Sequence, residues 1–91
     1  MAETTKLVRS GEPLSAVVDG ETVMFSPGQD AYFGLDAIGT RVWVLLEEPR
    51  KLDDICAVLR DEYEVDAETC RTDVVALIEQ LRDAKLVREV A

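Results

Sequence analysis

The sequence contains no histidine. Active sites that pair Ser or Cys with His are therefore excluded, and so are the common His-based zinc sites. There are only two cysteines, Cys56 and Cys70, and they show neither metal-ligand spacing nor a CxxC pair. Because free cysteines are usually buried, we expect two reduced thiols in or beside the core. The sequence predicts no metal and no cofactor.

Phosphate-binding loops are absent as well. The five glycines are scattered and form neither GxGxxG nor GxxxxGK[ST]. Carboxylate chemistry is the one remaining catalytic option, but the acidic residues do not cluster. They fall where helix starts and polar helix faces are expected, which is typical of a solvated surface. We therefore expect a protein that is not an enzyme.

No hydrophobic run approaches the roughly 20 residues that cross a bilayer, and residues 1–5 lack the apolar core of a signal peptide. We expect a cytoplasmic protein. Nineteen acidic residues against ten basic ones give a net charge of −9. This charge repels phosphate backbones and anionic lipids, so neither nucleic acid nor membrane is an expected partner. Residues 1–13 are mostly polar and predict a flexible N-terminal arm before a single domain over residues 14–91.

The first third of that domain has the pattern of a β-meander. Leu14–Val18 and residues 22–26 are strand-like, and the Asp19-Gly20 pair between them is a strong hairpin signal. Residues 27–30 predict a second turn, and Ala31–Leu35 a third strand. In the simplest topology the middle strand pairs on both sides. The third strand then keeps one free edge.

After Leu35 the hydrophobic period changes from two to 3.6 residues. Asp36 is a good N-cap for a first helix that ends before Pro49, and Trp43 is expected to pack in the core. A second helix follows, and Asp66 caps a third and longest one. Their apolar stripes are Ile38, Val42, Leu45 and Leu46; Leu52, Ile55, Leu59 and Tyr63; and Cys70, Val74, Leu77, Ile78 and Leu81. Residues 85–88 predict a short closing strand or wing. The expected fold is α+β and resembles a winged helix-turn-helix, with a three-stranded antiparallel sheet followed by three helices.

The segment from Tyr32 to Leu46 resembles the signature of the PqqD-like family: an aromatic strand, Leu-Asn/Asp, a small-residue turn and a Trp-containing helix. The agreement continues with Leu-x-x-Ile-x-x-x-Leu in the second helix and with an apolar pattern at the chain's end, and it spans about Leu14 to Val87. The matching positions there are Leu52, Ile55, Leu59, Leu81, Leu86 and Val87. One departure is Lys51, where the family often has Ser or Thr as a helix cap.

The resemblance implies a recognition element that holds the leader part of a ribosomally made precursor peptide and delivers it to modifying enzymes. Stand-alone members of this length are similar to the leader-binding proteins of split lasso-peptide systems. In those systems a separate leader peptidase of the cysteine-protease type removes the leader, and an ATP-dependent cyclase closes the ring. The implied partners are thus the precursor peptide, the peptidase and the cyclase.

A binding mechanism also follows from the residues themselves. An extended peptide can add as a strand to the free edge formed by Ala31, Tyr32, Phe33 and Gly34. Side chains alternate along a strand, so we expect Tyr32 to be an exposed contact and Phe33 to support the floor of a pocket. From the third helix, Asp73 is the candidate rim acceptor or charge partner. Val74 and Leu77 are candidate pocket residues, with ordinary core packing as the alternative for each apolar one.

Two other classes of function remain open. The second and third helices, joined by a short turn, are compatible with a winged-helix DNA-binding protein. Against this, the segment from Asp66 to Asp73 carries three acids and one base. A carrier or scaffold role is the other alternative, although no Asp-Ser-Leu carrier motif is present.

Overall fold

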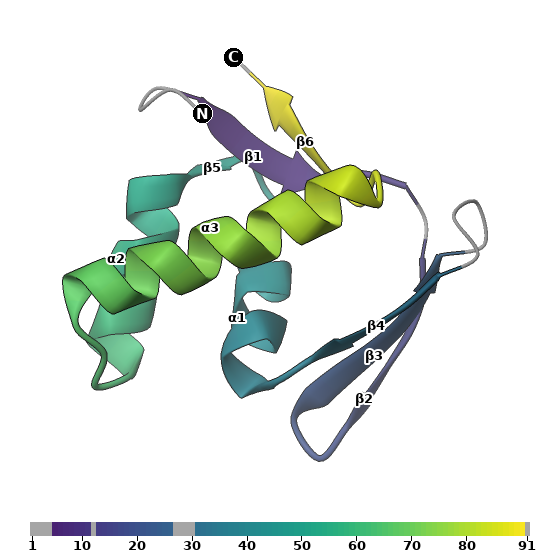
Figure 1. Ribbon diagram of the computed structural model, residues 1–91, viewed down its shortest axis with the longest axis horizontal. Helices are drawn as coiled ribbons and strands as arrows, with labels where there is room; N and C mark the ends of the chain where they lie inside the picture. The colour runs from purple at the N-terminus through teal and green to yellow at the C-terminus, as the bar shows by residue number, and fades with distance from the viewer. Residues whose placement is uncertain (1–4, 12, 27–30, 91) are drawn as a thin grey trace.

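Two three-stranded antiparallel sheets and three helices make up the described part of the chain (Figure 1). The computed structural model describes residues 5–11, 13–26 and 31–90, apart from the side chains of residues 26 and 31. The predicted α+β class is confirmed, and α1 and α3 lie between the two sheets in Figure 1. Among the described residues, no helix is both long and apolar enough to span a bilayer.

The first sheet is the predicted meander, with strands β2 (Leu14–Val18), β3 (Glu21–Ser26) and β4 (Ala31–Leu35) in the order β2-β3-β4. Its hairpin turn is confirmed. Asp19 and Gly20 have φ angles of 53° and 81°, the left-handed pair that a two-residue hairpin turn requires. The turn predicted over residues 27–30 lies outside the described residues. No described strand pairs with the second edge of β4.

Three helices follow in the predicted order: α1 (Ala37–Leu45), α2 (Leu52–Glu62) and α3 (Ala67–Asp83). Both predicted N-caps are present. The Asp36 carboxylate accepts a hydrogen bond from the Gly39 N–H at 2.8 Å, and the Asp66 carboxylate accepts one from the Thr69 N–H at 2.7 Å. These bonds satisfy backbone donors that have no partner inside the first helical turn. Lys51, at the same position before α2, makes no such side-chain bond.

The second sheet was not predicted. Strand β1 (Lys6–Arg9) lies between β5 (Arg50–Lys51) and β6 (Val87–Val90). The prediction of a flexible arm is therefore wrong for residues 6–9, while residues 1–4 and 12 lie outside the described residues. Four residues alternate too briefly to signal a strand, and their pairing partners lie far along the sequence. The predicted closing strand exists as β6, but it pairs with β1, so the winged helix-turn-helix description fits only loosely.

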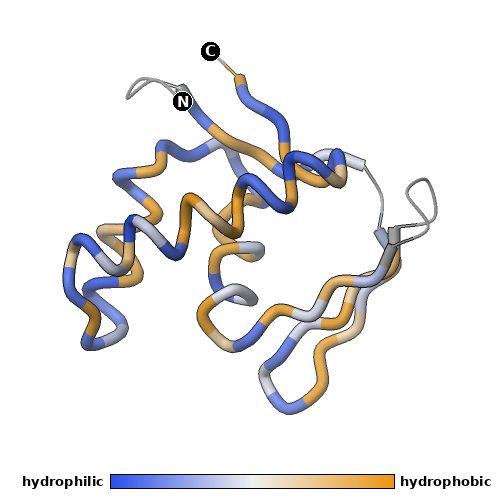
Figure 2. Tube along the Cα trace, viewed as in Figure 1, coloured by the Kyte–Doolittle hydropathy of each residue, from blue (hydrophilic) through white to orange (hydrophobic). Residues whose placement is uncertain are grey.

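The core combines residues from both sheets and all three helices. Its largest fully buried side chains are Leu7, Met24, Leu46, Ile55, Leu59, Ile78, Leu81, Leu86 and Val42. Figure 2 shows the same pattern along the chain, with hydrophobic segments recurring on α3 and on the β2-β3-β4 sheet. Trp43 is buried as predicted, and the Arg9 guanidinium lies 4.5 Å from its ring centroid.

The two cysteines are free and buried, as predicted. They lie on α2 and α3, where the Cys70 thiol is 4.0 Å from the Cys56 carbonyl oxygen. Burial raises the pKa of the Cys56 thiol to about 11, and the neighbouring Cys70 adds to this rise. Cys56 is thus a thiol at neutral pH and packs as a small apolar side chain.

Candidate functional site

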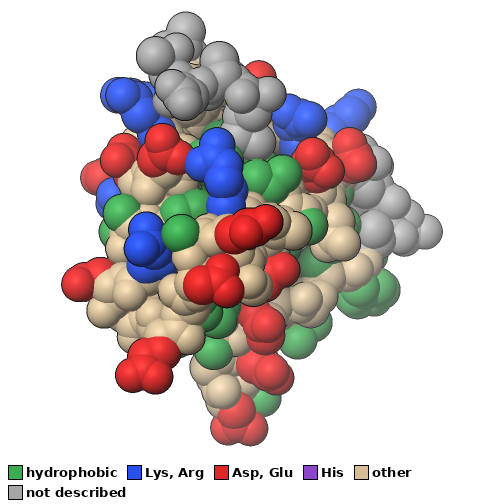
Figure 3. All heavy atoms as spheres, turned by 60° about the vertical axis from the view of Figure 1, so that its left-hand side comes forward, with side chains coloured by type: hydrophobic (Ala, Val, Ile, Leu, Met, Phe, Trp, Pro, Cys, Tyr) green, Lys and Arg blue, Asp and Glu red, His purple; other side chains and the backbone are tan. Residues whose placement is uncertain are grey.

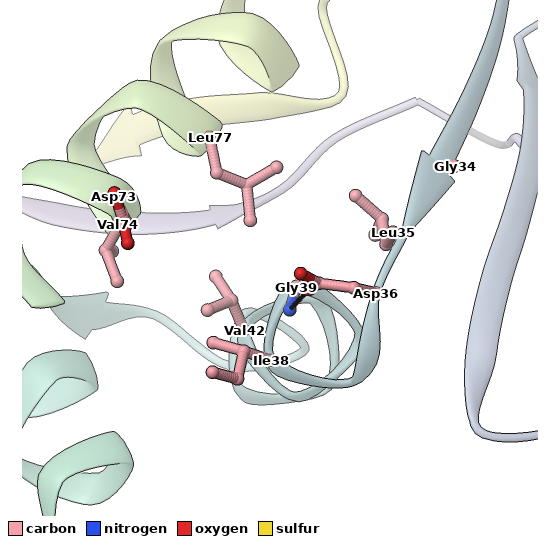
Figure 4. Close-up of a pocket in the computed structure, with 9 residues that line it drawn as sticks. All are labelled: Gly34, Leu35, Asp36, Ile38, Gly39, Val42, Asp73, Val74 and Leu77. Carbon is pink, nitrogen blue, oxygen red and sulfur yellow. Dashed lines mark hydrogen bonds between the residues drawn. The ribbon is translucent and has the colours of Figure 1, made fainter. Parts of the chain in front are cut away.

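A hollow of about 350 Å³ lies between the end of β4, the first turns of α1, and the middle of α3 (Figure 4). It is lined by Gly34, Leu35, Asp36, Ile38, Gly39, Val42, Asp73, Val74 and Leu77. The leucine, isoleucine and valine side chains form an apolar floor and walls, and the two aspartates add carboxylates to the lining. Such a hollow suits an apolar side chain of a ligand, with polar groups at the rim that fix its orientation.

Four of the seven predicted site residues line this hollow. Gly34 comes from β4, while Asp73, Val74 and Leu77 come from two neighbouring turns of α3. Val74 is buried, Leu77 is half-buried and Asp73 is exposed, so the three form a gradient from floor to rim. The predicted proximity of β4 and α3 is therefore present in the structure.

The other three predicted residues belong to β4 but do not line the hollow. Tyr32 is 76% exposed on the outer face of the sheet, where its ring lies 4.6 Å from that of Phe25. Phe33 points the other way and packs against the core half-buried. The backbone of Ala31 pairs in the ladder with Ser26, while its side chain lies outside the described part.

Sequence reasoning missed five lining residues. These are Leu35, Asp36, Ile38, Gly39 and Val42. The sequence predicts helix capping or core packing for most of them, because the spacing of the residues indicates only which face of a helix is apolar. One signal was available in Gly39. A Cβ atom there would lie 3.3 Å from both the Asp36 carboxylate and the Leu35 side chain, so the close turn from β4 into α1 favours glycine.

The register of the sheet indicates which β4 backbone groups face the open edge. Val18 and Glu21 close the two-residue hairpin, and such a closing pair is hydrogen bonded. Hydrogen-bonded and non-bonded pairs alternate along an antiparallel ladder. The backbone N–H and C=O groups of Thr22 and Met24 in β3 are therefore the ones that point towards β4. Their partners are Leu35 and Phe33. By this alternation the N–H and C=O groups of Tyr32 and Gly34 point away from β3, towards the open edge.

The arrangement offers binding groups rather than reactive ones. An open strand edge supplies backbone donors and acceptors, and the adjacent hollow supplies apolar contact. In the part of the chain that the structure describes, no three His, Cys, Asp or Glu side chains gather as a metal site would require. The fold and the hollow together define a small α+β domain in which one edge of β4, beside α3, has no partner among the described strands.

The chain belongs to the PqqD family. The model of this family, described as coenzyme PQQ synthesis protein D, matches residues 21–87. That range runs from the start of β3 to the start of β6 and includes every residue that lines the hollow. The resemblance inferred from the sequence is thereby confirmed. The search of curated proteins found no match to the chain.

Two solved structures are similar to this one over nearly the whole chain. The first is described as TbiB1 in complex with the TbiA(beta) leader peptide; it is 34% identical, has a TM-score of 0.78, and the match covers 92% of this chain and 98% of that one. The second is described as lasso peptide synthetase B1 complexed with the leader peptide. At 22% identity and a TM-score of 0.75, with 96% and 99% of the two chains covered, it supports the fold.

Proposed function

We propose that this chain is a non-catalytic recognition protein that binds the leader region of a ribosomally synthesised precursor peptide, of the lasso-peptide type. The observation that carries the proposal is the hollow beside the open edge of β4 in a chain 34% identical to TbiB1, which was solved with a leader peptide. The leader adds to β4 as a further antiparallel or parallel strand. Its inward side chains enter the hollow between β4 and α3.

Backbone pairing supplies one part of the affinity. The groups of Tyr32 and Gly34 that face the open edge become ladder partners, and each hydrogen bond contributes a net of about 0.5 to 1.5 kcal/mol. One apolar anchor buried against Val74 and Leu77 contributes about 1.5 to 3 kcal/mol before ordering costs. Ala31 and Phe33 hold the strand in place through the ladder with β3. Asp73 contributes a rim acceptor.

The charge at the start of α3 argues against recognition of DNA. The first turns of α3 present Asp66 and Glu68, and Arg71 forms an ion pair with Asp53 at 2.6 Å. A recognition helix with this charge would be repelled by phosphates on both sides of the groove. No observation on the described residues favours the winged-helix DNA-binding alternative.

Strand addition is tested with the TbiA(beta) leader peptide, with which the 34% identical TbiB1 was solved. On binding, amide exchange at Tyr32 and Gly34 should slow, because N–H groups open to water become ladder donors. Tyr32→Pro removes one outward donor, and Tyr32→Ala is its matched control because it removes the ring but keeps the donor. We expect Tyr32→Pro to lose more affinity than Tyr32→Ala in calorimetric titration. Equal affinities in two folded variants would leave docking by side chains alone as the better account.

Delivery of the leader to a peptidase of the cysteine-protease type, and then to a cyclase, requires a surface that stays free when β4 is occupied. The outer face of the β2-β3-β4 sheet meets this requirement. It exposes Leu14 by 65%, Val18 by 58%, Val23 by 50% and Tyr32 by 76%, a group of apolar side chains that a monomer rarely leaves open without a partner. We include this face in the proposal as the contact for the peptidase.

Val23→Glu tests the outer face. The side chain lies in the middle of β3, opposite Ala16 and Gly34, so a carboxylate there stays in water without disturbing the core. We expect leader affinity to remain within twofold of the parent, roughly the spread of neutral surface changes, while binding to the peptidase in a pull-down is lost. Retained peptidase binding would show that delivery uses another surface.

A further inference from the structure

The hollow between β4 and α3 has an unbalanced charge. Asp36 and Asp73 line it, and among the described residues no Lys or Arg does. One oxygen of Asp36 accepts the N-cap hydrogen bond from Gly39. Neither aspartate takes part in the ion pairs formed among the described residues, and both residues are exposed at the rim.

The basic residues of the two flanking helices are engaged elsewhere. Arg41, the one base in α1, forms an ion pair with Glu62 of α2 at 2.9 Å. The two bases of α3, Arg71 and Arg82, form ion pairs with Asp53 of α2 and Glu89 of β6, each at 2.6 Å. All three acidic partners belong to elements that do not line the hollow. The flanking bases thus neutralise charge away from the hollow.

The strand side of the hollow is equally poor in positive charge. Residues 10–40 contain no Lys or Arg, so the whole β2-β3-β4 sheet and the turn into α1 carry none. In Figure 3, Asp and Glu side chains lie among hydrophobic ones across the lower part of the visible face. An incoming anionic side chain would meet carboxylates with no compensating cation, whereas a cationic one would be attracted.

We infer that the hollow selects an extended peptide segment that carries a Lys or Arg close to a bulky apolar residue. This inference rests on the proposed leader-binding function and names the chemistry that the site reads. The apolar side chain packs on the floor formed by Ile38, Val42 and Val74. The cationic side chain lies at the rim, where the carboxylates of Asp73 and Asp36 accept its hydrogen bonds.

Strand geometry adds a rule of spacing. Successive side chains of a strand point to opposite faces of a sheet, so residues of the leader that face the hollow recur at every second position. The sequence positions of the base and the apolar anchor therefore differ by an even number. Moving the base by one position would place it on the outer face of the sheet, where Tyr32 is exposed. There it would point away from the carboxylates of the hollow.

A displayed library of random peptides is the probe. Selection on the immobilised protein should enrich sequences with a Lys or Arg at an even spacing from a bulky apolar residue. The variants are Asp73→Asn and Asp36→Asn, the second because Asn is as good an N-cap as Asp and keeps α1 in place. Asp61→Asn is the matched control, since it also removes one negative charge, but on an exposed part of α2 away from the hollow.

We expect each of the two hollow variants to weaken binding of a selected peptide about two- to fivefold, as for exposed charge pairs, and Asp61→Asn to have no comparable effect. The enrichment of bases should also disappear when selection is repeated on Asp73→Asn. An equal loss of affinity with Asp61→Asn, or enrichment of apolar extended peptides without a base, would overturn the inference. The proposed peptide-binding function would still stand in that case. If no peptide is retained, the proposed function fails as well.

Discussion

At the scale of single residues, Asp66 shows how one side chain sets the beginning of a helix. Its carboxylate accepts hydrogen bonds from the Thr69 N–H at 2.7 Å and from the Thr69 hydroxyl at 2.9 Å. Both bonds favour the charged form, the backbone bond more strongly, so the pKa of Asp66 lies below its ordinary value of 3.8. The cap is therefore linked to protonation.

This linkage predicts a pH dependence of folding. A depressed pKa stabilises the fold fully above the unfolded pKa, and the stabilisation is lost as pH falls through the lower folded pKa. For Asp66 the loss lies below about pH 4. Asp66→Asn keeps a capping side chain but does not titrate, so its stability in urea unfolding should fall less steeply than that of the parent as pH drops below this point. Identical pH profiles would contradict the assignment.

The two aromatic residues of β4 point to opposite faces of the sheet. Alternation along the strand predicted Tyr32 outside and Phe33 inside, and the exposures of the two side chains confirm this. What alternation could not predict is that Tyr32 lies against Phe25 rather than beside the hollow. That contact depends on the register between β3 and β4, which the residues of one strand do not encode.

At the scale of elements, α2 differs from the other two helices in its first turn. Lys51 has the extended backbone of an N-cap, with φ −78° and ψ 153°, but its side chain accepts no hydrogen bond. A cation also opposes the helix dipole at this end. In addition, Lys51 lies directly opposite Lys6 in the β1-β5 pair, where like charges are unfavourable. The helix start is therefore stabilised by Asp53 and Asp54 in its first turn and by packing.

Replacing Lys51 with serine should stabilise the protein. The serine hydroxyl can accept a hydrogen bond from a free N–H of the first turn, a change that typically contributes about 0.5 to 2 kcal/mol to the free energy of unfolding. Lys6→Ser separates the two causes, because it relieves the repulsion but adds no cap. We expect a clear rise in the urea midpoint for Lys51→Ser and a smaller one for Lys6→Ser. Equal rises would assign the effect to charge alone.

At the scale of the whole molecule, the second sheet joins the two ends of the chain. Leu7 of β1 is fully buried, and the strand pairs with β6 on one side and β5 on the other (Figure 1). Further backbone bonds run from the Arg9 N–H to the Leu46 carbonyl and from the Ser10 N–H to the Leu86 carbonyl. Residues 6–10 are thus part of the folded domain and support the helices that carry the hollow.

Leu7→Ala measures this contribution. Truncation of a buried leucine leaves a cavity and typically costs about 2 to 5 kcal/mol, a large part of the stability of a chain this small. Val44→Ala is the control, because Val44 is 43% exposed on α1 and its truncation should cost much less. The measurement is the free energy of unfolding in urea of each variant and of the parent. If both variants unfold alike, β1 contributes little.

The sequence by itself determined the strands β2, β3 and β4 and the three helices, because each is specified locally: a turn pair at Asp19-Gly20, caps at Asp36 and Asp66, and a hydrophobic period that changes after Leu35. It also predicted that β4 and α3 lie side by side, and residues of both line the hollow. Only the tertiary structure decided the pairing of β1 with β5 and β6 and the set of residues around the hollow. These strands are too short to be recognised alone, and both the pairing and the hollow form between segments that are distant in sequence, where no local pattern records which side chains meet.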